Sequence, residues 1–234
     1  MGMAVSVEQH GFAPGALARY ADWRRSPVPA DADCDSPFAR LLGDRWLFLP
    51  PAIRARFLRH IAVDACVTYT GEVTECRMSH AGRWLAQLAR LIGAPLPLGT
   101  DTGVSASVSV TADALGRGQF WTRHYGRRHG FPQVIHSVKR FAGPTGIEEY
   151  LGLGVGIALR LQEMGGALLF VSDHYFLKLG PVRLRLPAAL MPGTLTVGHH
   201  DLGNGRFLFS LDLVHPVLGE LVHQHAVFAD GDTR

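Results

Sequence analysis

The chain has 234 residues, of which 47% are hydrophobic and 18% charged, a composition that excludes disorder and is ample for one large core. Its formal charge of +3 is too small to indicate nucleic-acid binding. Every apolar run is interrupted before it reaches the roughly 18 residues that a membrane span needs. We therefore expect a single domain with no nucleic-acid partner and no transmembrane segment.

Two further features of the composition concern location and charge. The three cysteines, Cys34, Cys66 and Cys76, fit neither a C-x-x-C motif nor a zinc spacing, and no signal-peptide pattern begins the chain, so we expect a cytoplasmic protein. Arginines cluster within 54–59 and within 117–140. We expect most of them on solvated faces; the alternative is contact with an anionic ligand or with membrane headgroups.

The first part of the chain predicts helices. Residues 1–35 are expected to form a loosely packed arm, because Pro and Ala recur there without periodicity. Ser36-Pro37 predicts an N-cap and a short helix that ends at Gly43, and Pro50-Pro51 opens a second helix through about residue 60. A third helix follows Ser79 and is expected to close one side or one mouth of the sheet. Its predicted apolar face is Trp84, Leu85, Leu88, Leu91 and Ile92.

The rest of the chain predicts strands joined by short turns. Apolar and polar residues alternate, and Gly165-Gly166 and Gly203-Asn204-Gly205 stand where hairpin loops belong. The runs are 63–77, 104–111, 119–125, 133–141, 147–151, 155–164, 167–179, 182–186, 195–200 and 207–215. We expect an α+β domain over 36–229 with a tail at 230–234. Its core is a large curved antiparallel sheet, an open or closed barrel of eight to ten strands, with about three helices, mostly N-terminal.

Several short motifs resemble one known family. They are Ser36-Pro37-Phe38, Leu49-Pro50-Pro51, Gly71-Glu72-Val73, Pro95-Leu96-Pro97, Trp121-Thr122-Arg123, Glu149-Tyr150, Leu186-Pro187 and Gly219-Glu220-Leu221-Val222-His223. In order and spacing they resemble a bacterial family known only as domain of unknown function 4166, over roughly residues 36 to 229. The resemblance implies work on small metabolites, since members occur alone or attached to dehydrogenase-like domains. It implies no particular activity.

Acid–base catalysis is one chemistry that the strands would permit. An apolar interior desolvates a lone carboxylate and raises its pKa into a useful range. Glu149 and Asp173 interrupt otherwise apolar strands, and His136 lies on another strand, so we take these three residues as candidate catalytic groups. The alternative places them on the solvated face of a half-buried sheet.

Four other side chains are candidate ligand contacts. Trp121 and Arg123 share one face of their strand, where an arginine could hold a carboxylate or an enolate and a tryptophan supplies flat apolar area. Tyr150 and Tyr175 lie beside the two candidate carboxylates. A Trp–Arg stack on the surface would satisfy the same pattern.

The histidines raise the question of a metal. His223 and His225 share a strand face, and a third ligand such as Glu220, Asp201 or His215 could complete a site, but convergence of these side chains cannot be read from the sequence. Adjacent His199 and His200 face opposite sides of a strand, so at most one enters the interior. We expect surface or structural histidines, no metal and no cofactor.

The resulting functional hypothesis is a cavity within the sheet that binds a hydrophobic or carbonyl-containing small molecule. The alternative is a cofactor-independent enzyme of isomerase, cyclase or dehydratase type in metabolite biosynthesis, with Arg123 as the anion stabiliser. A third hypothesis is an interaction domain that pairs through a sheet edge, for example as a homodimer.

Overall fold

The computed structural model describes residues 36–230, except residue 64 and residues 114–117. The predicted arm over residues 1–35 lies outside the described residues, as does the predicted tail apart from Asp230. The helices are α2 (Pro37–Leu42), η2 (Gly43–Phe48), α3 (Pro51–Leu58), α4 (His80–Leu88), η3 (Ala89–Ile92) and η4 (Ala188–Leu190), where η marks a 3₁₀ helix. The strands are β1 (Cys66–Met78), β2 (Val104–Ala112), β3 (Gly118–Tyr125), β4 (Gln133–Arg140), β5 (Ile147–Gly152), β6 (Val155–Met164), β7 (Ala167–Leu179), β8 (Val182–Arg185), β9 (Thr194–Gly203), β10 (Arg206–His215) and β11 (Gly219–Ala229).

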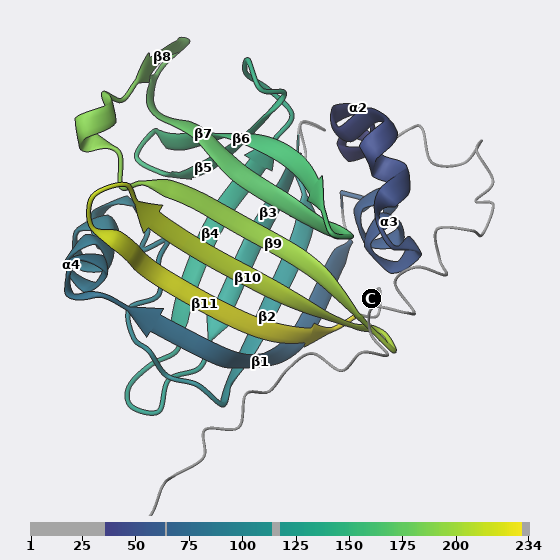
Figure 1. Ribbon diagram of the computed structural model, residues 1–234, viewed down its shortest axis with the longest axis horizontal. Coiled ribbons are helices and arrows are strands. Elements are labelled where there is room, and N and C mark those ends of the chain that lie inside the picture. Colours follow the sequence, from purple (N-terminus) through teal and green to yellow (C-terminus); the bar gives the residue numbers. More distant parts are fainter. Residues whose placement is uncertain (1–35, 64, 114–117, 231–234) are drawn as a thin grey trace, which may run out of the picture. The chain divides into compact units, whose positions relative to one another are not determined.

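The strands of the described residues form a closed antiparallel barrel (Figure 1). The 11-stranded sheet has the order β6-β5-β4-β3-β2-β1-β11-β10-β9-β7-β8, and β6 also pairs with β7. Every strand except β8 therefore has two neighbours in the closed wall, and β8 is attached to β7 alone. The predicted α+β fold is confirmed, and the sheet closes.

Neighbouring strands are mostly consecutive in the chain, because short turns can join antiparallel strands. Strands β1 to β7 follow one another round the wall, and β9 to β11 form a second meander. Pairing of β7 with β9 joins these two parts, and pairing of β1 with β11 completes the wall. The barrel consequently closes only when the first and last strands of the domain meet.

Alternation along each strand decides which side chains enter the barrel. In β3, Trp121, Arg123 and Tyr125 are buried, whereas Phe120 and His124, which alternate with them, are exposed. The same alternation runs through the facing strands and fills the interior mainly with apolar side chains. A polar residue at an inward position is therefore surrounded by apolar side chains.

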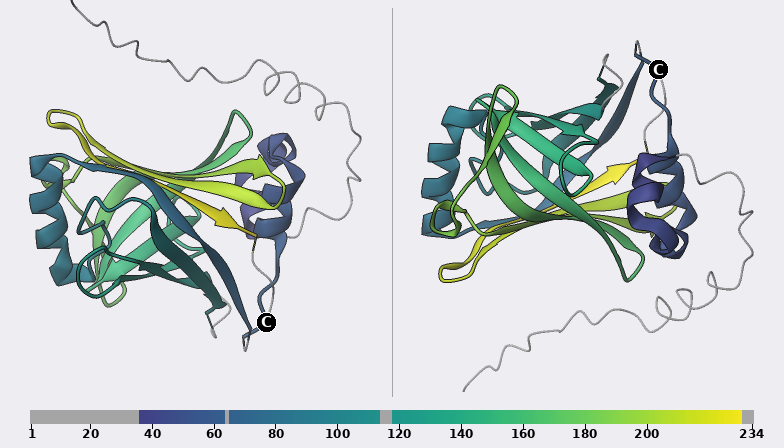
Figure 2. Two further views of the ribbon diagram at one scale, coloured as in Figure 1. Left: turned by 90° about the horizontal axis from the view of Figure 1, so that it is seen from below. Right: turned by 90° about the horizontal axis from the view of Figure 1, so that it is seen from above.

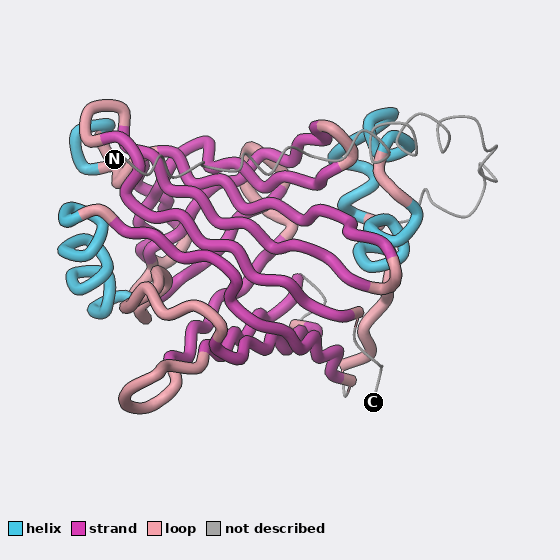
Figure 3. Tube along the Cα trace, turned by 60° about the horizontal axis from the view of Figure 1, so that its bottom comes forward, coloured by secondary structure: helices cyan, strands magenta, loops and turns pink. Residues whose placement is uncertain are grey.

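The helices lie at the two ends of the barrel, as Figures 2 and 3 show. At one end, α2 begins with the predicted Ser36 cap, whose Oγ accepts a hydrogen bond from the Phe38 amide, and it stops at Gly43. Phe38 and Phe57, from α2 and α3, pack edge to face with ring centroids 5.1 Å apart. Their rings therefore help to fill this end of the barrel.

Helix α4 lies at the other end, against β11. Its predicted cap is confirmed, because the Ser79 Oγ accepts a hydrogen bond from the Gly82 amide at 3.1 Å. A Cβ atom at Gly82 would lie 1.9 Å from the Leu221 carbonyl oxygen, so glycine is what allows the helix to approach the strand this closely. The helix lies at one mouth of the sheet, as expected, and borders that mouth without closing it.

The expected solvation of the arginine clusters is wrong for several members. Arg54 and Arg56 of α3 are buried, and so is Arg123 of β3. Arg56 forms an ion pair with Asp230 at 2.7 Å, and its guanidinium lies 3.8 Å from the centroid of the Phe207 ring. An ion pair and a ring contact compensate the lost hydration of Arg56, which sequence spacing alone could not reveal.

Helices in the described part of the chain are too short or too polar to cross a membrane.

Candidate ligand-binding pocket

A pocket of about 510 Å³ extends into the barrel from the end that carries α4. Its walls are almost entirely apolar and come from strands on both sides of the barrel. They include Leu151, Val155, Ile157, Leu195, Leu211 and Leu213. This volume lies within the range of about 300–1,000 Å³ that is typical of sites for small molecules.

The mouth of the pocket is made by short helices. Leu88 of α4, Leu91 of η3 and Leu190 of η4 all line the pocket, yet they are 65%, 75% and 69% exposed. Of the apolar face predicted for this helix, Leu85, Leu88, Leu91 and Ile92 line the pocket, whereas the buried residues of α4 are Gly82 and Ala86. These leucines border an opening instead of packing on the sheet, so their apolar surface is available to an incoming molecule.

Arg123 is the principal polar group at the inner part of the pocket. It points inward from β3, and its Nη2 donates hydrogen bonds to Ser137 Oγ at 2.8 Å and to Glu149 Oε1 at 2.9 Å. Its Nε is buried without a hydrogen-bond partner among the described residues. Arg123 therefore keeps a donor that its protein neighbours do not use.

Lys139 completes the charged group that surrounds Glu149. The Lys139 Nζ lies 3.1 Å from Glu149 Oε2 and 4.7 Å from the centroid of the Trp121 ring. Burial lowers the pKa of Lys139 to about 8, although the carboxylate of Glu149 opposes this shift. Burial by itself would raise the pKa of Glu149, but Lys139 and Arg123 together lower it to about 2. The carboxylate is thus ionised at neutral pH and faces two cationic partners.

Tyr175 adds a hydroxyl to the pocket wall. It enters from β7 and is held by a hydrogen bond to Ser172, whose Oγ also accepts from the Leu195 amide at 2.9 Å. Burial raises the pKa of Tyr175, so the side chain remains a neutral phenol that can donate or accept a hydrogen bond.

An aromatic layer lies on the side of Arg123 that faces α3. There His199, surrounded by aromatic rings, borders a second cavity of only about 10 Å³, which Arg123 and Trp121 also line. Burial and the nearby charge of Arg56 hold the pKa of His199 well below its usual value, so its imidazole is neutral. This layer fills the barrel between the larger pocket and α3, and it agrees with the expectation that one member of the His199-His200 pair enters the interior.

The structure places four of the predicted site residues inside the barrel. Glu149 and Arg123 contact each other at the inner part of the pocket, and Tyr175 lies in the pocket wall. Trp121 lies behind Arg123 and lines the smaller cavity. Inward alternation on strands β3, β5 and β7 brings these residues together although they are distant in sequence.

The other three predicted residues lie on the outside of the barrel. His136 is exposed on β4 and its Nδ1 is 3.1 Å from Thr122 Oγ1. Tyr150 bonds to the Glu148 carboxylate beside Arg183 of β8. The structure does not bring either residue into the pocket.

Asp173 stands at an irregularity of β7. Its carboxylate forms a hydrogen bond with His174 and an ion pair with Arg160, both at 2.6 Å, and these two contacts lower its pKa. The register with β6 shifts at this point, so Ser172 and His174 have successive partners and Asp173 has none. The bulge sets Asp173 apart from the pocket residues.

Lys139 and Ser137 are the site residues that sequence reasoning missed. Both lie on β4 at positions that alternate with His136 and Val138, and they are buried, as is Ile135 at the preceding inward position. The buried Ser137 and Lys139 are polar, whereas Val138 between them is apolar. The pattern of polar and apolar residues in β4 therefore does not show which face of the strand is buried. The available signal was the spacing of Lys139 from Ile135, since residues four apart lie on the same face of a strand.

Among the described residues, the charged side chains that line the pocket are Arg123 and Glu149, which do not make up a set of metal ligands. The grouping with such spacing that the described residues contain is Glu75, His223 and His225, which lies on another part of the wall.

Comparison with known proteins identifies the family. Among curated proteins, none matches the chain. The sequence model of the family described as Domain of unknown function (DUF4166) matches residues 49–228, which is well over half of the chain. The chain therefore belongs to the DUF4166 family.

Proposed function

We propose that the barrel binds a small, mostly apolar molecule that carries one acidic group. The apolar part occupies the pocket, and the acidic group contacts Arg123 at its inner part. The observation that carries this proposal is an apolar pocket of about 510 Å³ whose innermost charged group, Arg123, has a buried donor without a protein partner.

The charges around Arg123 favour an anionic ligand over a neutral one. Arg123 and Lys139 carry two positive charges, and Glu149 carries one negative charge, so one positive charge is unbalanced when Lys139 is protonated. A buried charge without a counter-ion is costly, and the lowered pKa of Lys139 expresses that cost. A carboxylate or similar anion in the pocket would balance the group and raise the pKa of Lys139 again.

The other polar groups of the pocket would fix the orientation of a bound molecule. The Tyr175 hydroxyl and the Glu149 carboxylate border the same pocket as Arg123, while the walls toward the mouth are apolar. A molecule with a polar end and an apolar body is therefore held in one orientation, with its body toward α4. The exposed leucines at the mouth extend the apolar surface along which it would enter.

Binding is better supported than turnover by proton transfer. A general base in the pocket needs a pKa near the working pH, whereas the pKa of Glu149 is lowered to about 2 by its two cationic neighbours. Asp173 and His136 are on the outer face of the barrel. The role of Glu149 that agrees with this geometry is to hold Arg123 and Lys139 in place.

The proposal can be tested by titration of the purified full chain, freed of bound lipid, with an intrinsically fluorescent polyene fatty acid and with the alcohol of the same chain length. We expect the acid to bind more tightly than the alcohol. Arg123→Met should weaken acid binding by about 10–100-fold, since a hydrogen bond to a charged group contributes about 1.5–3 kcal/mol. It should change alcohol binding little.

Two further variants give the controls. Arg160→Met removes an exposed arginine from the outer face of β6 and should leave both affinities unchanged. Ile157→Trp places an indole in the pocket wall and should abolish binding of acid and alcohol alike. Failure of both probes to bind, or binding that Ile157→Trp leaves intact, would contradict the proposal.

A further inference from the structure

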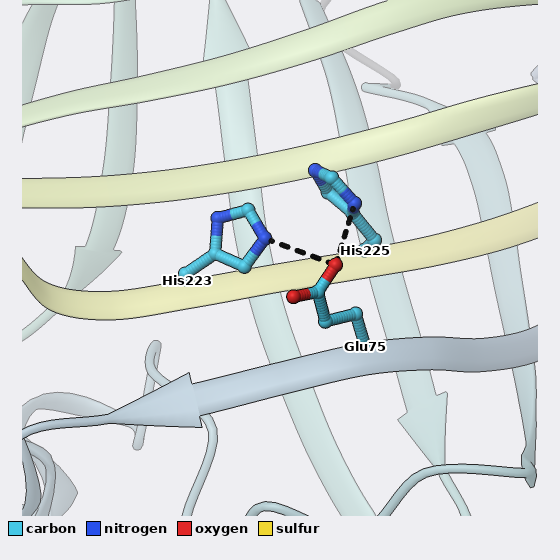
Figure 4. A group of neighbouring side chains, drawn as sticks. All are labelled: Glu75, His223 and His225. Carbon is cyan, nitrogen blue, oxygen red and sulfur yellow. Dashed lines mark ion pairs between the residues drawn. The ribbon is translucent and has the colours of Figure 1, made fainter. Parts of the chain in front are cut away.

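A second cluster of polar side chains lies on the outer wall, where the first and last strands of the barrel meet. Glu75 of β1 points toward His223 and His225 of β11 (Figure 4). The two histidines share a face of β11 because they are two residues apart. Their imidazoles are close, with ring centroids 4.3 Å apart. None of these residues belongs to the pocket.

A β-bulge brings the carboxylate to this face. Val73 and Cys76 of β1 both belong to the core, although strict alternation would place residues three apart on opposite faces. The register with β11 shifts between Val73 and Glu75, so that Glu75 stands opposite His225 on the outer face. Bulges of this kind re-aim a side chain. Here the bulge turns a carboxylate toward two imidazoles.

The three donor atoms have the spacing of ligands around one metal ion. The Glu75 Oε2 lies 3.6 Å from His223 Nε2 and 3.5 Å from His225 Nδ1, and all three donors lie within 4.8 Å of one another. Tetrahedral zinc with bonds of about 2.0–2.1 Å requires separations of about 3.4 Å between its ligands. The donors therefore need to move little to receive the ion.

Neighbouring charged side chains orient His223 and Glu75 for metal binding. The His223 Nδ1 is 2.6 Å from Asp212 Oδ1 on β10, which leaves the Nε2 atom to face Glu75. A carboxylate behind a metal-bound histidine is a common arrangement, because it fixes the ring orientation and raises its basicity. Arg77 binds the other oxygen of Glu75, Oε1, so that Oε2 is the atom directed at the histidines.

The local charge also matches a divalent cation. Three carboxylates, Glu75, Asp212 and Glu220, surround the cluster against the single guanidinium of Arg77, which leaves two negative charges while the histidines are neutral. A neutral imidazole is the form that binds a metal.

We infer that Glu75, His223 and His225 form a binding site for a divalent transition-metal ion, with Zn²⁺ as its occupant. Two imidazoles and one carboxylate are a ligand set that zinc accepts, and three protein ligands leave a fourth position for water. The ion would link β1 to β11 across the seam that closes the barrel. The site is separate from the proposed ligand pocket.

The experiment is calorimetric titration of the full chain, stripped with a chelator, with ZnCl₂. We expect one Zn²⁺ per chain at this site and a higher melting temperature with the metal, because a ligand of the native state stabilises it. The double variant His223→Ala/His225→Ala should lose this binding and the melting shift. Asp212→Asn, which removes only the orienting carboxylate, should weaken binding by about 10–100-fold.

A matched variant distinguishes this cluster from other histidines. His124→Ala removes an exposed imidazole from the outer face of β3 and should bind Zn²⁺ as the unmodified chain does. Substitution of Co²⁺ should give the visible absorption of a tetrahedral site in the His124→Ala variant and not in the double variant. Absence of zinc binding, or binding that the double variant retains in full, would overturn the inference, provided that circular dichroism shows the variant folded.

Discussion

The charged group beside the pocket predicts opposite effects for two substitutions that each remove one charge. Glu149→Gln leaves Arg123 and Lys139 without a carboxylate in an apolar interior. Lys139→Met leaves the Arg123–Glu149 pair, which Ser137 also supports through a hydrogen bond to the guanidinium. The first variant should be strongly destabilised, while the second should be as stable as the unmodified chain or more stable.

The sizes of these two stability changes follow from the burial of Glu149 and Lys139. Removal of one partner from a buried ion pair costs about 3–5 kcal/mol. The pKa of Glu149, lowered from 4.5 to about 2, gives a similar figure of about 3 kcal/mol at about 1.4 kcal/mol per unit of pKa. For Lys139, the fall from 10.5 to about 8 means that its charge opposes folding, so Lys139→Met should gain up to about 3 kcal/mol.

The assay is urea unfolding at pH 7 and at pH 10. Between about pH 8 and pH 10.5 the unfolded state binds more protons at Lys139 than the native state does. The unfolding free energy of the unmodified chain should therefore rise across this interval relative to Lys139→Met, and the gap between them should narrow. If Lys139→Met lost as much stability as Glu149→Gln at pH 7, the assignment of an unbalanced charge to Lys139 would be refuted.

Three other predictions concern pH and packing. Because the pKa of His199 is held well below 6.5, the unfolded state takes up a proton first as pH falls; urea unfolding should show stability declining below about pH 6.5, and less so in His199→Phe. Binding of the fluorescent acid should weaken above about pH 8, where Lys139 loses its proton, and this change should be absent in Lys139→Met. Gly82→Ala should cost about 1–3 kcal/mol in the same unfolding assay, because its Cβ meets the Leu221 carbonyl; Gly99→Ala, whose nearest neighbour is 3.8 Å away, is the matched control.

The strands were predictable because alternation and turn glycines act locally. The predicted runs over 155–164 and 167–179 coincide with β6 and β7. Closure of the sheet was not predictable, since it depends on pairing between β1 and β11, which are remote in sequence. The exposure of Leu88 and Leu91 was missed for a related reason: an apolar helix face looks the same in sequence whether it packs on a sheet or borders an open pocket.

The candidate site residues also differ in whether local sequence signals could identify them. Arg123 and Glu149 were identifiable because they stand two residues from the apolar Trp121 and Ile147, on the same strand face, and all four are buried. Asp173 and Glu75 stand at register shifts, where one extra residue ends the alternation from which a direction could be read. A carboxylate next to a bulge therefore cannot be assigned to a face until the partner strand is known.

The presence of Lys139 in an apolar interior is explained by a ligand better than by stability. The charge of Arg123 already balances that of Glu149, so the lysine adds a charge that the protein itself does not balance. An anion in the pocket would supply the missing charge, and the same Lys139→Met substitution should then raise stability while weakening acid binding. A stabilising change that impairs binding is the expected mark of a group whose charge is directed at a ligand and not at the fold.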